Sequence, residues 1–250
     1  MDYPNHSSST PEHLFNSYQA TGTRSKSFIA NVFAYMFLAL GISAVVAYLF
    51  AENREWLTFM FDQTTRKPNI WGYIVMFAPL GFVLLMSFGF KKLSAPVMIL
   101  LFIVYSGITG ITLSFVLLSY AASSVFGCFA SAAAMFGVMA FMGYTTNKDL
   151  TSFGRIMTMG LIGIVIASVI NMFLGNSTMD YIISFVGVLV FTGLTAYDVQ
   201  KIKRIGEGFD ENGQALEGDV KKFAIMGALT LYLDFINLFL MLLRLFGKRD

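Results

Sequence analysis

The chain is organised by long stretches that contain no charged residue. Five of them cover residues 27–51, 68–90, 93–147, 156–179 and 181–197. A helix that crosses a bilayer needs about 20 consecutive, mostly apolar residues. Four of the stretches fit one span each, and 93–147 fits two spans joined by a turn in the small polar cluster 119–124. A last stretch, 223–243, is apolar apart from Asp234 and a few neutral polar residues.

These stretches predict an all-α, polytopic membrane protein built as a seven-transmembrane-helix bundle. Charged residues make up only 13% of the chain, whereas a soluble domain carries about 25%. Residues 1–27 are polar and are interpreted as a mobile cytoplasmic tail, residues 203–219 as an acidic soluble loop, and 28–246 as a single transmembrane domain. The helices are expected near 28–50, 70–90, 96–118, 121–143, 154–174, 179–200 and 223–244.

Lysine and arginine in the connecting segments predict the orientation of the bundle. Loops on the cytoplasmic side of a membrane carry an excess of these residues. With the N-terminus inside, the inner segments hold eleven of the 17 basic residues. Seven spans would then put the C-terminus outside, whereas the basic residues from Arg244 onward favour the inside. The last helix is therefore expected either to span the membrane or to re-enter it.

Two aspartates inside predicted spans are the strongest candidates for function, because an ionisable group within a membrane is costly. Asp198 lies at the inner end of the sixth span and Asp234 in the middle of the seventh. Each has threonine or asparagine neighbours at helical spacing, which places the polar groups on one face. We interpret the two acids as a shared ion and proton site and as possible transient Ca²⁺ ligands. Possible pore-lining residues are Thr195, Thr230, Asn237 and Asn171.

Two facing carboxyl groups at low dielectric tend to share one proton, so the pair is a candidate pH sensor. When both are ionised, their oxygens suit a hard cation such as Ca²⁺. Alternatively, Asp198 marks the membrane boundary beside Lys201, and Asp234 makes a helix–helix hydrogen bond to a neutral group. Measured from Lys201 and Lys222, the two acids would differ in depth by about 13 Å. Pairing therefore requires either an extended seventh helix or a sixth helix that ends in a water-filled vestibule.

Several segments resemble the Bax inhibitor motif family of transmembrane proteins, in its bacterial type. The segment around Asp198, Gly193-Leu194-Thr195-Ala196-Tyr197-Asp198-Val199-Gln200-Lys201-Ile202, resembles the family signature. Residues 231–239, LYLDFINLF, resemble its last helix, residues 105–114 its third helix, and residues 144–151, YTTNKDLT, its loop between the fourth and fifth helices. The resemblance covers nearly everything after residue 25.

The resemblance implies a seven-helix bundle with a central last helix, in a bacterial inner (plasma) membrane. It implies a pH-sensitive calcium leak governed by an aspartate pair, which Asp198 and Asp234 match, and it favours the vestibule as the explanation of the depth difference. In some members an arginine of the second helix is thought to hold one aspartate. Here no basic residue lies between Lys67 and Lys91, so such a latch must differ.

Other functions stay open at this point. A membrane adaptor that modulates a membrane-bound protease or a stress response would need no transport. An intramembrane aspartyl protease also uses Tyr-Asp on one helix, as in Tyr197-Asp198, but its second aspartate is expected in a Gly-x-Gly-Asp context that Asp234 lacks. No soluble enzyme motif is recognised, so we expect neither catalysis nor a cofactor other than Ca²⁺ as a transported ion. A net charge of +2 gives nucleic-acid binding no electrostatic support. The expected partners are the bilayer, Ca²⁺, H⁺ and, in the adaptor case, a protease.

Overall fold

The computed structural model describes residues 11–61, 68–212 and 217–249, and these residues form helices joined by short connections. Seven of the helices are long and apolar enough to cross a bilayer, which confirms the predicted fold class. In chain order the helices are α1 (Pro11–Glu52), the short α2 (Arg54–Thr58), α3 (Ile70–Gly89), α4 (Ala95–Ser119), α5 (Ala122–Thr145), α6 (Thr151–Leu174), α7 (Ser177–Asn212) and α8 (Glu217–Phe246).

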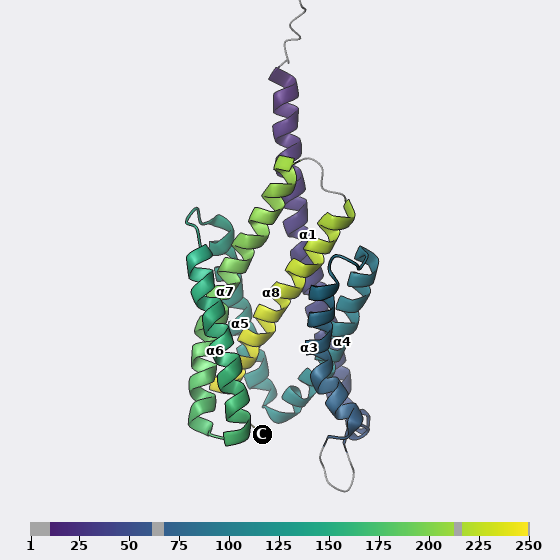
Figure 1. The fold of residues 1–250 in the computed structure, drawn as a ribbon. Coiled ribbons are helices and arrows are strands. Elements are labelled where there is room, and N and C mark those ends of the chain that lie inside the picture. The colour runs from purple at the N-terminus through teal and green to yellow at the C-terminus, as the bar shows by residue number, and fades with distance from the viewer. Residues whose placement is uncertain (1–10, 62–67, 213–216, 250) are drawn as a thin grey trace, which may run out of the picture.

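The helices form two groups with α8 running obliquely between them (Figure 1). One group contains α1, α3 and α4, and the other contains α5, α6 and α7. Helix α8 packs against α7, α1, α5 and α4, whereas α3 packs mainly against α4 and α6 mainly against α7. In the most apolar part of each helix, 72% of α8 is buried but only 6% of α3. The last helix is therefore the core of the molecule, and α3 and α6 are its outer wall.

The outer wall carries large apolar side chains that point away from the core. Phe88 on α3 and Phe173 on α6 are among the most exposed large apolar residues of the described chain, and so is Phe126 on α5, in the same helix group as α6. Aromatic surfaces of this extent are unfavourable in water and suit contact with lipid. The exposed faces of the bundle are thus consistent with its predicted place in a membrane.

Several helices extend further than their apolar stretches. Helix α1 begins at Pro11, so residues 11–27 of the expected tail are helical; residues 1–10 lie outside the described part of the chain. Helix α7 continues to Asn212, and α8 begins at Glu217. The loop expected at 203–219 is therefore mostly helix. A charged residue ends an apolar stretch but not a helix, since Lys and Glu are good helix formers, and Lys203 pairs with Glu207 one turn later at 3.8 Å.

Helix α8 runs without a break from one end of the bundle to the other, as Figure 1 shows. The residues that follow it contact the turn between α4 and α5: the amide of Ala121 donates to the carbonyl of Lys248 at 2.9 Å, and the amide of Lys248 donates to Ser124 Oγ at 3.0 Å. That turn lies at the end of the bundle opposite the start of α1, the end of α7 and the start of α8 (Figure 1). The C-terminal end and the start of α1 are therefore at opposite ends of the molecule.

Candidate functional site

The two predicted acids lie together at the contact between the two most buried helices. Asp198 of α7 is 9% exposed and Asp234 of α8 is 5% exposed, and the two carboxyl groups interact electrostatically. Two interacting carboxyl groups form a hydrogen bond when one of them carries a proton. The second oxygen of Asp234, Oδ2, is buried and has no hydrogen-bond partner among the described residues. The two acids therefore form a pair that can take up a proton, and Oδ2 of Asp234 accepts no hydrogen bond from the described residues.

The extended helices remove the depth difference that the sequence suggested. Counted from the helix ends at Asn212 and Glu217, the two acids differ by three residues, or about 4.5 Å of helical rise. The basic residues that served as membrane markers, Lys201 and Lys222, both lie within helices that continue past them. They are therefore not reliable markers of one common membrane surface.

A vestibule also reaches Asp198, so both explanations of the pairing apply. It is a cavity of about 500 Å³ between α1, α3, α7 and α8. Its polar and charged lining residues include Lys91, Lys201 and Thr230. The positive charge of Lys201 attracts the Asp198 carboxylate. Helix α3 has no basic residue within it, so it offers no counterpart of the arginine that is thought to hold one aspartate in some family members. Lys91, just beyond the end of α3, lines the same cavity as Asp198.

Close approaches of α7 to its neighbours set the position of Asp198. A methyl group added to Gly143 of α5 would collide with the backbone of Ala196, and one added to Gly154 of α6 would collide with the ring of Tyr197. Small residues let membrane helices approach this closely. The two residues before Asp198 are thus packed directly onto two different helices, and this fixes the rotation and height of α7 at the acid.

Gln200 is a positioning residue that the sequence analysis missed. Its side chain is buried. Its Nε2 donates to the carbonyl of Lys148 at 2.8 Å, and its Oε1 accepts from the amide of Leu150 at 2.9 Å. The side chain therefore satisfies two backbone groups of the α5–α6 connection, two residues from Asp198. The available signal was an uncharged amide between the charged residues Asp198 and Lys201.

Asp149 completes the attachment of this connection to α7. Its Oδ1 accepts from the amide and hydroxyl of Thr151 at 2.9 and 2.6 Å and pairs with Arg204 of α7 at 2.9 Å. The hydrogen bonds from Thr151, followed by the bond and charge of Arg204, lower the pKa of Asp149 to about 2. The α5–α6 connection is thus tied to α7 by one amide and one ion pair.

A hydroxyl network holds α8 against the other helix group. Ser43 of α1 donates to the carbonyl of Ser106 of α4 at 2.7 Å, and its Oγ lies 2.6 Å from the hydroxyl of Tyr232. Because the single hydroxyl proton of Ser43 is used on Ser106, Tyr232 is the donor in the second bond. On the other side of Asp234, the ring of Phe235 packs edge-on against Phe136 of α5 at 5.6 Å. Asp234 is therefore flanked by two anchored aromatic residues.

The other predicted site residues lie in different surroundings, and only one of them shares the vestibule with Asp198. Thr230 lines the vestibule with Asp198. Thr195 is fully buried, and its hydroxyl donates to the carbonyl of Phe191 within its own helix at 2.8 Å. Asn237 is half-buried on α8, three residues beyond Asp234.

The suggestion that Asn171 lines a pore is not supported by its position. Its Nδ2 donates to Asp180 Oδ1 at 2.6 Å and to the carbonyl of Asn176 at 3.1 Å, and its Oδ1 accepts from the amide of Asn176. It closes the turn between α6 and α7. Along α7 this turn is about 27 Å from Asp198, counted from Asp180. Asn171 is therefore a structural residue at the far end of the helix pair.

Comparisons with known proteins point to one family. The family model described as "Inhibitor of apoptosis-promoting Bax1" matches residues 25–250. The inner membrane protein YbhL of Escherichia coli strain K12 is 43% identical over 224 residues, which are 90% of this chain and 92% of YbhL. A protein of Rickettsia prowazekii is 42% identical over 89% of both chains. One of Borreliella burgdorferi is 40% identical over 89% of this chain and 92% of its own length.

Proposed function

The chain belongs to the Bax inhibitor motif family of multi-pass membrane proteins, and from this membership and the geometry of the site we propose that it is a pH-sensitive leak for calcium or a similar hard cation. The observation that carries the proposal is the carboxyl pair of Asp198 and Asp234, buried between the two central helices at the end of a cavity. A mid-membrane carboxyl pair is costly to maintain. A site of this kind is expected where protons or cations pass.

The pair acts as the element that responds to pH. With one shared proton, it carries one negative charge and joins α7 to α8 by a hydrogen bond. Two unit charges 4 Å apart repel by about 4 kcal/mol at an effective dielectric of 20, so loss of that proton breaks the bond and separates the helices or admits a cation. We place this transition near neutral pH. Proton loss and ion passage are thereby linked through helix packing.

Charges in the vestibule favour a passing ion over a resident one. Lys91 and Lys201 face the cavity together with Asp198. Loss of the shared proton changes the pair from one negative charge to two, which balances the two lysines. Ca²⁺ takes six to eight oxygen ligands, whereas the described residues contain no group of three or more His, Cys, Asp or Glu side chains that could hold a metal. A cation at the pair would keep much of its water, as suits transport.

We assign no catalytic step to the pair, and we place the N-terminus in the cytoplasm. The end of α3, the α5–α6 connection and the second half of α7 lie at the end of the bundle at which α1 begins (Figure 1). These segments contain Lys91, Lys148 and Lys201. The excess of basic residues on the cytoplasmic side of membrane proteins supports this orientation. The vestibule would then open toward the cytoplasm.

Calcium flux from reconstituted vesicles tests the proposal. Flux is measured across pH 6–8 for the wild type, Asp198→Asn, Asp234→Asn and the double variant. We expect a transition near neutral pH in the wild type, its loss in each single variant, and little further change in the double variant. A single variant that keeps the wild-type midpoint would show that the acids do not act together. Absence of flux at every pH would instead support an adaptor without transport.

A further inference from the structure

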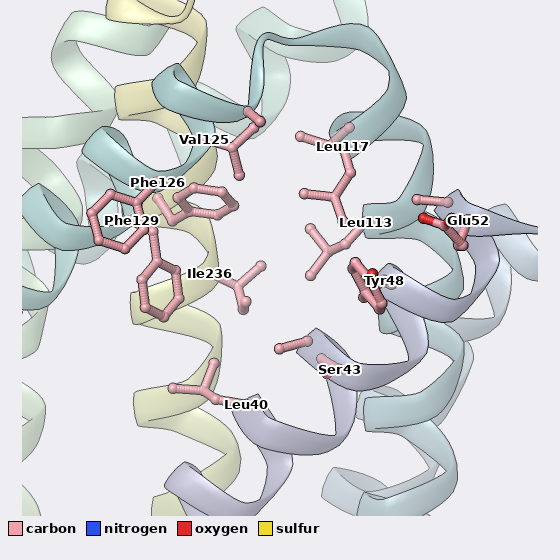
Figure 2. A pocket seen from close by; sticks show the side chains of 16 residues that line it. Leu40, Ser43, Tyr48, Glu52, Leu113, Leu117, Val125, Phe126, Phe129 and Ile236 are labelled. Carbon is pink, nitrogen blue, oxygen red and sulfur yellow. The ribbon is translucent and has the colours of Figure 1, made fainter.

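A second cavity lies in the other half of the bundle, away from the vestibule. It has a volume of about 560 Å³ and is enclosed by α1, α4, α5 and α8. Figure 2 shows side chains of α1 and α5 facing one another across it, with Ile236 of α8 between them. Helix α5 packs on α7 and α8, whereas α1 packs most extensively on α4 and also on α8 and α7. The cavity therefore lies between the two helix groups, beside α8.

The walls of this cavity give water little to bind. Most of the lining is apolar, including Leu40, Leu113 and Phe129. Ser43 is the polar residue in the interior, and its hydroxyl is already bonded to Ser106 and Tyr232. Tyr48 and Glu52 lie on the last turns of α1. An apolar cavity without free polar partners does not hold ordered water, so the occupant must be apolar over most of its length.

The cavity is open to its surroundings within the membrane-spanning part of the bundle. Among its lining residues, Phe126 is 75% exposed and Tyr48 is 63% exposed, and Ala44 is also exposed. The same end of the molecule carries exposed Trp56 and Trp71. Tryptophan and tyrosine collect at the level of lipid head groups. The mouth of the cavity therefore lies at the membrane interface, and its interior lies at the depth of the acyl chains.

Charges of both signs lie near the mouth. Glu52 lines the cavity from α1. On the other side, the chain at Lys248 is hydrogen-bonded to Ala121 and Ser124, next to the cavity residues Ala122 and Val125. Arg249 lies over the ring of Tyr120 at 5.7 Å. An acid on one side and two basic residues on the other complement a head group that has an amine and a phosphate.

We propose that this cavity binds one acyl chain of a zwitterionic, amine-bearing phospholipid from the leaflet on the side of the C-terminus. The chain lies along Ile236 and Phe239 of α8. The amine is directed to Glu52, and the phosphate to the basic residues after α8. The site is independent of the aspartate pair and of the proposed leak.

A photo-crosslinking experiment tests the site. The protein is reconstituted with a phosphatidylethanolamine that carries a diazirine on its acyl chain, and labelled peptides are mapped. We expect the label to be several-fold enriched on 40–52 and 122–129 over the lipid-facing surface of α6. Ala44→Trp fills the cavity from an exposed position and should reduce this labelling at least threefold. Ala133→Trp, on an exposed position of α5 outside the cavity lining, is the matched control and should leave it unchanged.

A separate competition experiment tests which lipid head group the site prefers. Unlabelled phosphatidylethanolamine should compete with the label better than phosphatidylglycerol does, and Glu52→Gln, an exposed substitution that leaves the fold intact, should remove that difference. Uniform labelling of all exposed helix faces in the wild type would overturn the proposal. So would equal labelling of Ala44→Trp and wild type.

Discussion

The vestibule and the acyl-chain cavity have similar volumes and share α1 and α8 as walls, but they differ in polarity. In the vestibule, α7 contributes Asp198 and Lys201, and Lys91 lies opposite. In the acyl-chain cavity, α4 and α5 contribute only apolar residues to the wall. Asp198 occurs where α7 is attached to α5, to α6 and to the connection between them. The comparison teaches that the charged cavity adjoins close helix contacts, whereas the apolar cavity adjoins no such attachment of α7 within the described chain.

The largest expected effect comes from loosening the attachment of α7. Gly143→Ala would force apart α5 and α7 at Ala196, and overpacking of this kind costs about 1–3 kcal/mol. We expect a lower thermal-unfolding midpoint and a displaced pH transition of flux, with unchanged lipid crosslinking in the other cavity. Thermal unfolding and the flux profile measure the two effects.

Gly137→Ala is the matched control for this substitution, because nothing lies within 4 Å of a methyl group at that position of the same helix. It should change stability by at most about 1 kcal/mol, in the stabilising direction, since alanine favours helix over glycine. If the two alanine variants behave alike, the close approach at Ala196 does not position Asp198.

The next effect concerns the other side of α8. Ser43→Ala removes the acceptor of the Tyr232 hydroxyl and leaves a buried donor without a partner, which costs about 1–3 kcal/mol. Tyr232→Phe removes only the donor, while Ser43 keeps its bond to Ser106, so the expected loss is about 1 kcal/mol. Both variants should alter lipid crosslinking and retain the pH transition of flux. A larger loss of stability in Tyr232→Phe than in Ser43→Ala would contradict the assigned direction of the bond.

The smallest effect belongs to the surface ion pair of the α5–α6 connection. The pKa of Asp149 is lowered from 3.8 to about 2, so its contribution to stability is present above pH 4 and is lost as the pH falls through about 2. Asp149→Asn should therefore slightly lower the unfolding midpoint at pH 7 and have a smaller effect at pH 2, where only about half of the Asp149 carboxyl groups are ionised. The exposed position of this carboxylate and screening by solvent keep the effect small. If the variant is equally destabilised at both pH values, Asp149 does not stabilise the protein through its negative charge.

The fold was predictable because a helix that crosses a membrane must consist of a long, mostly apolar stretch, which is visible in the sequence. The five stretches without charge correspond to six of the spans, and the mostly apolar stretch 223–243 around Asp234 corresponds to the seventh. The break between α4 and α5 at Tyr120 and Ala121 falls within the predicted cluster 119–124. The helix ends were not predictable in the same way. Charge reports where the apolar environment stops, whereas a helix such as α7 continues through Lys203 and Glu207 into the polar phase.

The candidate site was partly predictable for a related reason. Asp198 and Asp234 stand out because carboxyl groups are rare in membrane spans, and that cost is visible in sequence. Gln200 and Asn171 show the limit: both are buried amides, yet one supports the site and the other closes a distant turn. Which backbone groups an amide satisfies depends on helices far apart in the chain, and a single sequence does not contain that information.

The central position of α8 has a consequence for biosynthesis, because this helix is also the last to be made. Until it leaves the ribosome, the six earlier spans must reside in the membrane without their core. Asp198 then lacks the carboxyl partner that it has in the finished bundle, and the buried face of α7 is open to lipid or water. Until α8 inserts and brings Asp234, the carboxyl group of Asp198 must be either protonated or hydrated. Assembly of the bundle and completion of its ionisable site are therefore the same late event.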